Sequence, residues 1–156
     1  MPDGYEFLTS STTRFVKVRN AVQPDPDFQW YKVSKKRLND IAQLPVGWDG
    51  YRAPAVSLNN AIFALDILKE ICIETTPPPQ VVPGVNSNCQ IEWHTLLGDM
   101  EINVKSPNHV EVFYSLLGDD PREDEVLLRN DFTEIIPFLR QITEKPEPTI
   151  AHAATA

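Results

Sequence analysis

Residues 89–114 read CQIEWHTLLGDMEINVKSPNHVEVFY, and this stretch decides the fold. Apolar and polar residues alternate along it, with breaks at Gly98-Asp99 and at Pro107-Asn108. A period of two turns every second side chain of an extended chain toward the same side, which is typical of strands with one buried face. Short breaks of Gly, Pro, Asn and Asp are typical of hairpin turns. The stretch therefore predicts three consecutive antiparallel strands.

The two breaks also predict how these strands pair. A two-residue turn at 98–99 would place Trp93 opposite Val104, and a three-residue turn at 107–109 would place Val104 opposite Val112. Both turns gather the apolar residues on one face of the sheet, as the burial of a single face requires. On the other face, the same pairing predicts a row of cross-strand charges formed by Glu92, Lys105 and Glu111.

Two helices are expected before the strands. The second, over residues 57–73, has apolar residues at every third or fourth position after Ser57, a favoured N-cap residue. The three prolines at 77–79 would stop any continuation, because proline has no N–H to donate. A shorter first helix is expected to begin after Ser34, another N-cap candidate, and to end before Pro45.

Further elements are expected on both sides of this core. Residues 80–85 are apolar but contain Pro83, which favours an edge strand. Residues 126–128 predict a short last strand, and a helix is expected over 131–143 with a kink at Pro137. The predicted fold class is α+β: an antiparallel β-meander of three to five strands packed against two to three helices.

The length of 156 residues suits one domain of ordinary size with loose ends. Residues 1–27 lack sustained periodicity, and residues 145–156 are rich in Pro, Thr and Ala without an apolar face. We therefore predict a mostly flexible N-terminal segment over 1–27, a single α+β domain over 28–144 and a disordered tail over 145–156.

Charge is distributed unevenly along the chain. The net charge is −8, and residues 53–156 alone carry −10, from 16 acidic and 6 basic residues. Such acidity repels phosphate backbones, so we expect no direct binding of nucleic acid. It favours another protein, one with a basic surface, as the partner.

Targeting and redox signals are few. Residues 1–20 lack the apolar segment of a signal peptide, and the apolar stretch 61–73 is too short and too charged to span a bilayer. We therefore expect a cytoplasmic protein without membrane contact. In that compartment Cys72 and Cys89 are expected to be buried reduced thiols, with a disulfide between them as the alternative. Two cysteines without a CxxC spacing give no zinc motif, and no cofactor is expected.

One local pattern resembles a known group of proteins. Gly47-Trp48-Asp49-Gly50-Tyr51 precedes a proline and a Ser-capped helix, and Gln90-Ile91-Glu92-Trp93-His94 precedes a hairpin with Met100-Glu101-Ile102. Over residues 44–115 this pattern resembles small bacterial proteins with a GWDGY loop and an IEW-type hairpin, a group without an established activity. The resemblance implies a bacterial or phage cytosolic setting and assigns no site residues.

The loop around Trp48 is the most distinctive local feature, and two interpretations of it are open. In the first, Trp48 and Tyr51 fill the core while Asp49 bonds to the turn backbone. In the second, the loop binds a partner, because Tyr, Trp and Arg are the residue types that dominate interface hot spots. The candidate binding residues are Trp48, Asp49, Tyr51 and Arg52.

A second candidate surface is the acidic segment 118–125, which is expected to be a loop. It is either a solvated loop or a mimic of phosphates that steers a basic partner. Its candidate binding residues are Asp119, Asp120, Glu123, Asp124 and Glu125.

Signals of catalysis are weak. The chain has no GxSxG, HExxH, P-loop, GxGxxG or EF-hand pattern. The polar sheet face holds Glu92, His94 and Glu101, whose side chains could bind a divalent metal or act as acid and base. A solvated face with Lys105 between carboxylates is the favoured interpretation, so we predict no catalytic residues and no metal site.

These observations favour a function in binding. We expect an acidic cytosolic protein-binding module that sequesters or regulates a partner, of the antitoxin, immunity or phage-inhibitor type. Two alternatives are a structural subunit of a larger assembly and a metal-dependent hydrolase that uses the polar sheet face.

Overall fold

The computed structural model of the chain describes residues 24–118 and 120–144. The predicted flexibility of residues 1–23 and the predicted tail over 145–156 concern parts of the chain that lie outside the described residues, as does Asp119.

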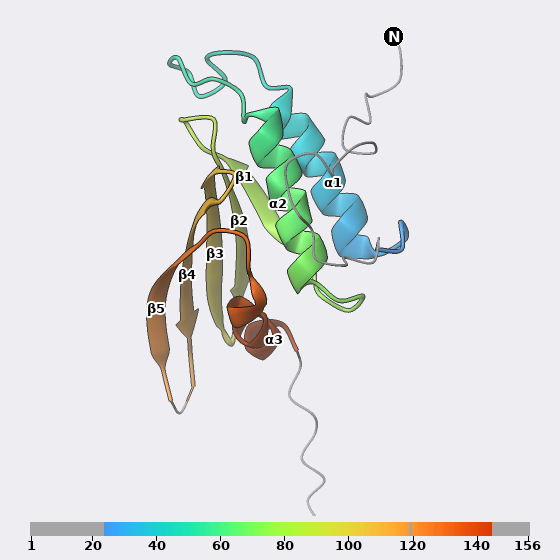
Figure 1. Cartoon of the computed structure of the whole chain (residues 1–156), viewed down its shortest axis with the longest axis vertical. Coiled ribbons are helices and arrows are strands. Elements are labelled where there is room, and N and C mark those ends of the chain that lie inside the picture. The colour runs from blue at the N-terminus through green and yellow to red at the C-terminus, as the bar shows by residue number, and fades with distance from the viewer. Residues whose placement is uncertain (1–23, 119, 145–156) are drawn as a thin grey trace, which may run out of the picture.

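The predicted α+β meander is confirmed. Five antiparallel strands form one sheet in the order β1-β2-β3-β4-β5, and three α-helices accompany it in the described part of the chain. Figure 1 shows the helices on one side of this sheet, with α1 and α2 lying side by side. The elements are α1 (Gln29–Ala42), α2 (Leu58–Ile71), β1 (Gln80–Pro83), β2 (Cys89–Thr95), β3 (Gly98–Ser106), β4 (His109–Leu116), β5 (Arg122–Leu128) and α3 (Ile136–Thr143).

Helix α2 is the centre of the core. It lies between α1 and the sheet and contacts both β2 and β3. It begins as predicted, because the Ser57 hydroxyl oxygen accepts the N–H of Asn60 at 3.2 Å. Its buried apolar residues, such as Leu65 and Leu68, belong to the same cluster as Trp93 and Val104 of the sheet.

Helix α1 begins earlier than predicted. It starts at Gln29, and Ser34 lies inside it, fully buried, instead of capping its end. Trp30 is 1% exposed and shares a helical face with Ser34, Leu38 and Ile41. Because this whole face is buried, the helix begins more than one turn earlier in the sequence than predicted.

The predicted turn at 98–99 is wrong. The β2–β3 turn is formed by Leu96-Leu97, so Trp93 pairs with Met100 and Cys89 with Val104. The Thr95 hydroxyl closes this turn, accepting the Leu97 N–H and donating to the Gly98 carbonyl, each at 3.1 Å. The shift moves the pairing by an even number of residues, so the predicted buried face is kept.

Gly98 lies in β3 and not in the turn, at a position where β4 and α3 leave no room for a side chain. A Cβ at this position would collide with the carbonyl oxygen of Ser115 on β4 and approach the Ile142 side chain of α3. The glycine therefore permits close strand and helix packing, which is the other common reason for a glycine in a strand.

The predicted row of charges is only partly right. Glu92 pairs with Glu101 across the sheet and not with Lys105. Lys105 sits at an irregularity of β3 between Val104 and Ser106, yet its ammonium group still binds the Glu111 carboxylate as predicted.

The last helix also differs from its prediction. A short 3₁₀ turn, Thr133–Ile135, leads into α3, and Pro137 lies in the first turn of that helix. Proline is tolerated there because its missing N–H would have no partner inside the helix, so the expected kink is replaced by a helix start. Asp131 accepts the Thr133 N–H at 3.0 Å, ahead of the 3₁₀ turn.

Asn60 joins α2 to two sheet turns. It is 3% exposed, and its Nδ2 donates to the carbonyl oxygens of Ser87 (2.9 Å) and Lys105 (3.2 Å). Ser87 precedes β2 and Lys105 lies near the end of β3, so one amide group fastens both chain segments to the start of α2.

We expect Val104→Asp to abolish cooperative folding. Val104 is fully buried, and an unpaired carboxylate there would cost several kcal/mol, comparable to the whole stability of a domain of this size. Asn103→Asp is the matched control, because Asn103 is the adjacent residue on the other sheet face. Thermal unfolding followed by circular dichroism checks both variants. A cooperatively melting Val104→Asp chain would contradict the assignment of the faces.

Asp66 gives a prediction about pH. It is 5% exposed on α2, and burial raises its pKa to about 6, although the Lys69 ammonium at 3.5 Å opposes the rise. Its pKa is therefore higher in the folded chain than in the unfolded one. Such a group stabilises the fold fully below about pH 4, and this contribution is lost as the pH rises through about 6.

Asp66→Asn should remove this dependence. We expect the free energy of unfolding of the variant, relative to the natural chain, to grow from about pH 4 to about pH 7, because asparagine has no charge to bury. Urea denaturation at several pH values measures the difference, and a difference that does not change with pH would refute the assignment.

Candidate functional site

The loop between α1 and α2 is held by its own hydrogen bonds. Asp49 Oδ1 accepts the backbone N–H groups of Tyr51 (3.0 Å) and Ala53 (3.1 Å). The Gly47 N–H donates to the Ala53 carbonyl at 2.9 Å, and Trp48 Nε1 donates to the Pro54 carbonyl at 2.8 Å. Gly47 has φ +83°, in the left-handed region that favours glycine. These bonds give the loop a defined shape.

The two open interpretations of this loop apply to different residues. Asp49 bonds to the turn backbone, as the first interpretation expects, and Trp48 is half-buried against the loop. Tyr51 does not fill the core: its side chain is 86% exposed, and Arg52 is exposed beside it. An ordered loop thus presents Tyr51 and Arg52 to solvent.

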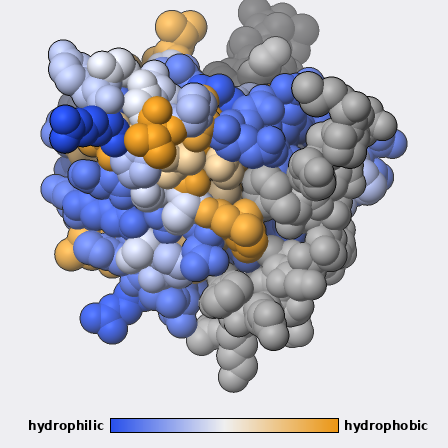
Figure 2. All heavy atoms as spheres, turned by 90° about the horizontal axis from the view of Figure 1, so that it is seen from above, coloured by the Kyte–Doolittle hydropathy of each residue, from blue (hydrophilic) through white to orange (hydrophobic). Residues whose placement is uncertain are grey.

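Apolar side chains accompany this loop at the same end of the molecule. Figure 2 views that end from above and shows a group of apolar side chains among polar ones. Val46 is 77% exposed on the α1–α2 loop, and Val85 is 55% exposed on the turn between β1 and β2. Exposed aliphatic and aromatic residues on ordered loops are typical of protein contact surfaces.

The second candidate surface is the face of the sheet that carries no helix in the described residues (Figure 1), here called the open face. The strand pairing places one row of Glu92, Glu101, Phe113 and Glu125 across it. Like charges directly opposite each other, such as Glu92 and Glu101, are unfavourable unless neighbouring groups bind them. The carboxylates of the open face are Glu92, Asp99, Glu101, Glu111, Glu123 and Glu125.

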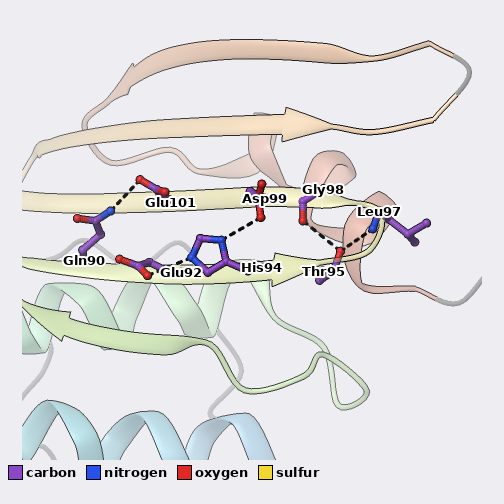
Figure 3. Close-up of polar contacts among 8 residues, drawn as sticks. All are labelled: Gln90, Glu92, His94, Thr95, Leu97, Gly98, Asp99 and Glu101. Carbon is purple, nitrogen blue, oxygen red and sulfur yellow. Dashed lines mark hydrogen bonds and ion pairs between the residues drawn. The ribbon is translucent and has the colours of Figure 1, made fainter.

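His94 relieves part of this repulsion. Figure 3 shows its imidazole between two carboxylates: Nδ1 lies 2.9 Å from Asp99 Oδ1, and Nε2 lies 3.1 Å from Glu92 Oε2. The hydrogen bonds to Asp99 and Glu92 raise the pKa of His94 above its usual value. Glu101 is bound separately, by Gln90 Nε2 at 2.9 Å.

The arrangement does not bring the three residues of the hydrolase alternative together. Both ring nitrogens of His94 already face carboxylates, and Glu101 bonds to Gln90 instead of the imidazole. In residues 24–118 and 120–144, no three His, Cys, Asp or Glu side chains are placed to share a metal ion.

The expected acidic loop is wrong for most of its length. Glu123, Asp124 and Glu125 belong to β5, which begins at Arg122 and is four residues longer than the predicted strand. The phase of β5 explains this: Val126 and Leu128 face inward, and the Tyr114 hydroxyl lies 3.4 Å from the Asp124 carboxylate on the same side. Asp120 is exposed in the preceding turn.

The two predicted sets of binding residues lie apart. The α1–α2 loop is at the upper end of Figure 1, and the β4–β5 turn is at the lower end. Trp48, Asp49, Tyr51 and Arg52 therefore do not form one surface with the acids of β5.

Sequence reasoning gave no site role to three members of the open face. Asp99 faces His94 only in the observed register, so the misplaced turn hid it. Phe113 and Leu127 are apolar residues at the polar phase of their strands, and Leu127 is 70% exposed. An apolar residue out of phase is a signal that the alternating pattern itself contains.

Comparison of the chain with protein-family models, with curated proteins and with solved structures finds no match. None of the described helices combines the length and the apolar character needed to cross a membrane. Cys72 and Cys89 are both free thiols, and burial raises the pKa of each. The disulfide alternative is therefore not formed.

The loop geometry predicts that substitutions of Tyr51 and Asp49 change the stability by different amounts. Tyr51→Ala should change the free energy of unfolding by less than about 0.5 kcal/mol, because the side chain is exposed. Asp49→Ala should cost about 1–2 kcal/mol, because two backbone N–H groups lose their acceptor. Urea denaturation measures both, with Asp49→Asn as the control that keeps Oδ1. Equal effects of the two alanine variants would contradict this division of roles.

Proposed function

We propose that the chain is an acidic protein-binding module of the bacterial cytoplasm that sequesters or regulates a basic partner, as antitoxins, immunity proteins and phage inhibitors do. One observation carries this proposal: a whole sheet face is left open by the helices and holds six carboxylates. A face of this kind attracts a positively charged protein and repels the phosphates of nucleic acid.

The open face also has the layout of an interface. Phe113 lies between Glu101 and Glu125 in the central row, and Leu127 is opposite Glu111. Apolar and aromatic residues surrounded by charged ones resemble the apolar core and polar rim of protein interfaces. Glu123 and Glu125 are exposed at its border, where charges act mainly on the association rate.

The α1–α2 loop supplies a second contact in this proposal. Its shape is fixed before binding, so little conformational entropy is lost when Tyr51 and Arg52 become buried. Because this loop and the acidic start of β5 lie at opposite ends (Figure 1), a single partner would have to extend along the molecule to touch both. Binding of two partners, or of one at a time, satisfies the same geometry.

The structural-subunit alternative differs in its response to salt. A module that captures a basic partner depends on long-range attraction, which screening beyond about 10 Å removes at 0.1 M ionic strength. A subunit of a permanent assembly is held by a larger apolar interface, whose strength salt affects less. The hydrolase alternative instead predicts saturable binding of a divalent metal that His94→Ala abolishes.

The experiment is affinity capture from a bacterial lysate with the full chain, followed by association kinetics of the captured protein at about 50 and about 500 mM salt. We expect a basic protein whose association slows several-fold at high salt, and slows likewise for the double variant Glu123→Gln/Glu125→Gln. The double variant Asp27→Asn/Glu74→Gln is the matched control, because it removes two exposed charges outside the sheet.

The control variant should associate nearly as fast as the natural chain. An association rate that changes neither with salt nor with the loss of the two β5 charges would refute the proposal for the open face. Tyr51→Ala should then be compared by its dissociation rate, since loss of a buried anchor acts mainly there.

A further inference from the structure

The two edge strands of the sheet, β1 and β5, differ in how far they are protected from pairing with another strand. At one edge, β1 has only four residues and ends in Pro83, and Arg37 Nε donates to the Val81 carbonyl at 2.9 Å. A short strand, a proline and a covering side chain are the usual ways to block pairing with another strand. At the other edge, β5 has seven residues and β4 as its single strand neighbour in the described chain (Figure 1).

The backbone of β5 offers hydrogen-bonding groups on its outer side. The Glu125 N–H donates to the exposed Asp124 Oδ1 at 2.8 Å, so this N–H is directed away from β4. Successive residues of a strand direct their N–H and C=O groups to opposite sides. The backbone N–H and C=O groups of Glu123, Glu125 and Leu127 therefore all face outward. Of these, the Glu125 N–H has the Asp124 carboxylate as its acceptor.

A cleft adjoins the upper end of this edge. It has a volume of about 500 Å³ and is lined by Leu127 and Leu128 of β5 and by the polar segment that follows, which comprises Arg129, Asn130, Asp131, Thr133 and Glu134. Two leucines next to outward peptide groups, with polar residues beyond them, suit an extended peptide segment that carries both apolar and polar side chains.

We propose that the β5 edge binds an extended segment of a protein partner as a sixth, antiparallel strand, whose apolar residues lie beside Val126–Leu128 and whose basic residues lie beside Glu123–Glu125. This inference rests on the proposed function, because it names the partner element that the module recognises. Main-chain hydrogen bonds would provide affinity, and the change from acidic to apolar residues along β5 would set direction and register.

Charge complementarity selects a basic strand over a second copy of this chain. When two β5 strands pair antiparallel about Glu125, that residue meets its own copy and Glu123 meets Leu127. A shift by two residues, the smallest that keeps the outward peptide groups facing each other, can set Glu123 against Glu125 and Asp124 against its own copy. Neither pairing supplies a cation, and Arg122 already lies over the Phe138 ring at 5.6 Å. Self-pairing is therefore disfavoured.

The test uses the full chain labelled with ¹⁵N and three synthetic peptides. The first, Ile-Val-Val-Lys-Lys-Lys, has the proposed order for antiparallel pairing. The second has the reverse order and the same composition. The third is the first peptide with methyl groups on the backbone nitrogens of its second and fourth residues, which would face Leu127 and Glu125. It keeps every charge but loses two donors.

We expect saturable shifts of the Glu123, Glu125 and Leu127 amides with the first peptide, and affinities about tenfold lower for each of the other two. Equal affinities for all three peptides would overturn the proposal, because charge alone would then explain the binding. In the peptide-free chain, protection of the Glu123 and Leu127 amides from exchange, or shifts that grow with protein concentration, would also overturn it. Those results would mean that the chain itself or a second copy occupies the edge.

A pair of variants tests the same edge in the chain. Glu125→Pro removes the outward N–H and the charge, whereas Glu125→Gln removes only the charge. Proline is tolerated at edge positions whose N–H faces outward, and the methylated peptide keeps the test decisive if this variant fails to fold. We expect Glu125→Pro to weaken binding of the first peptide about tenfold more than Glu125→Gln does.

The outcome also separates this inference from the proposed function. A captured basic partner that binds the Glu125→Pro chain as well as the Glu125→Gln chain would overturn strand addition and leave the binding module intact. Failure to capture any partner, with the peptides still binding as expected, would count against the function and not against the edge.

Discussion

Burial of α2 is the constraint on which the rest of the structure depends. This helix is covered on one side by α1 and on another by β2 and β3, and it carries buried residues around most of its circumference. A helix that must be covered on several sides draws the other elements to one side of the sheet. The open face is therefore a direct consequence of how α2 is packed, since no described helix remains to cover it.

An open sheet face must be compatible with water, and this chain achieves that mainly with carboxylates, together with His94 and the ion pair between Lys105 and Glu111. Glu92 and Glu101 are opposite each other, and each has a hydrogen-bond partner: His94 for Glu92 and Gln90 for Glu101. Like charges opposite each other are unfavourable by themselves, and these two hydrogen bonds offset part of that repulsion. On β5 the acids disfavour self-pairing, so in the strand addition that we propose its outer peptide groups stay accessible to a basic segment.

The sequence predicts the elements of the fold better than their boundaries. Period-two alternation places Trp93 and Val104 on the buried face whichever turn joins their strands, so the face is right although the register is wrong. Gly98 misleads because a glycine in a close contact looks like a glycine in a turn. Pro137 misleads in the same way, since a helix start and a kink have the same local signature.

The candidate site follows the same rule. The bonds of Asp49 are local and can be predicted, because acceptor and donors are within four residues of each other. The exposure of Tyr51 and the extension of β5 are settled by distant parts of the chain, which a single sequence does not bring together. The tertiary fold likewise places the α1–α2 loop and the β4–β5 turn at opposite ends of the molecule, which the sequence does not reveal (Figure 1).

Asn60 has a consequence for how the molecule loosens. Its one amide group holds the segments around Ser87 and Lys105 to the first turn of α2, and that turn is itself capped by Ser57. Three regions that are distant in sequence are therefore held together by the hydrogen bonds of one side chain. Opening at any of them releases the others, so this end of the domain should fluctuate as one cooperative unit instead of as independent loops.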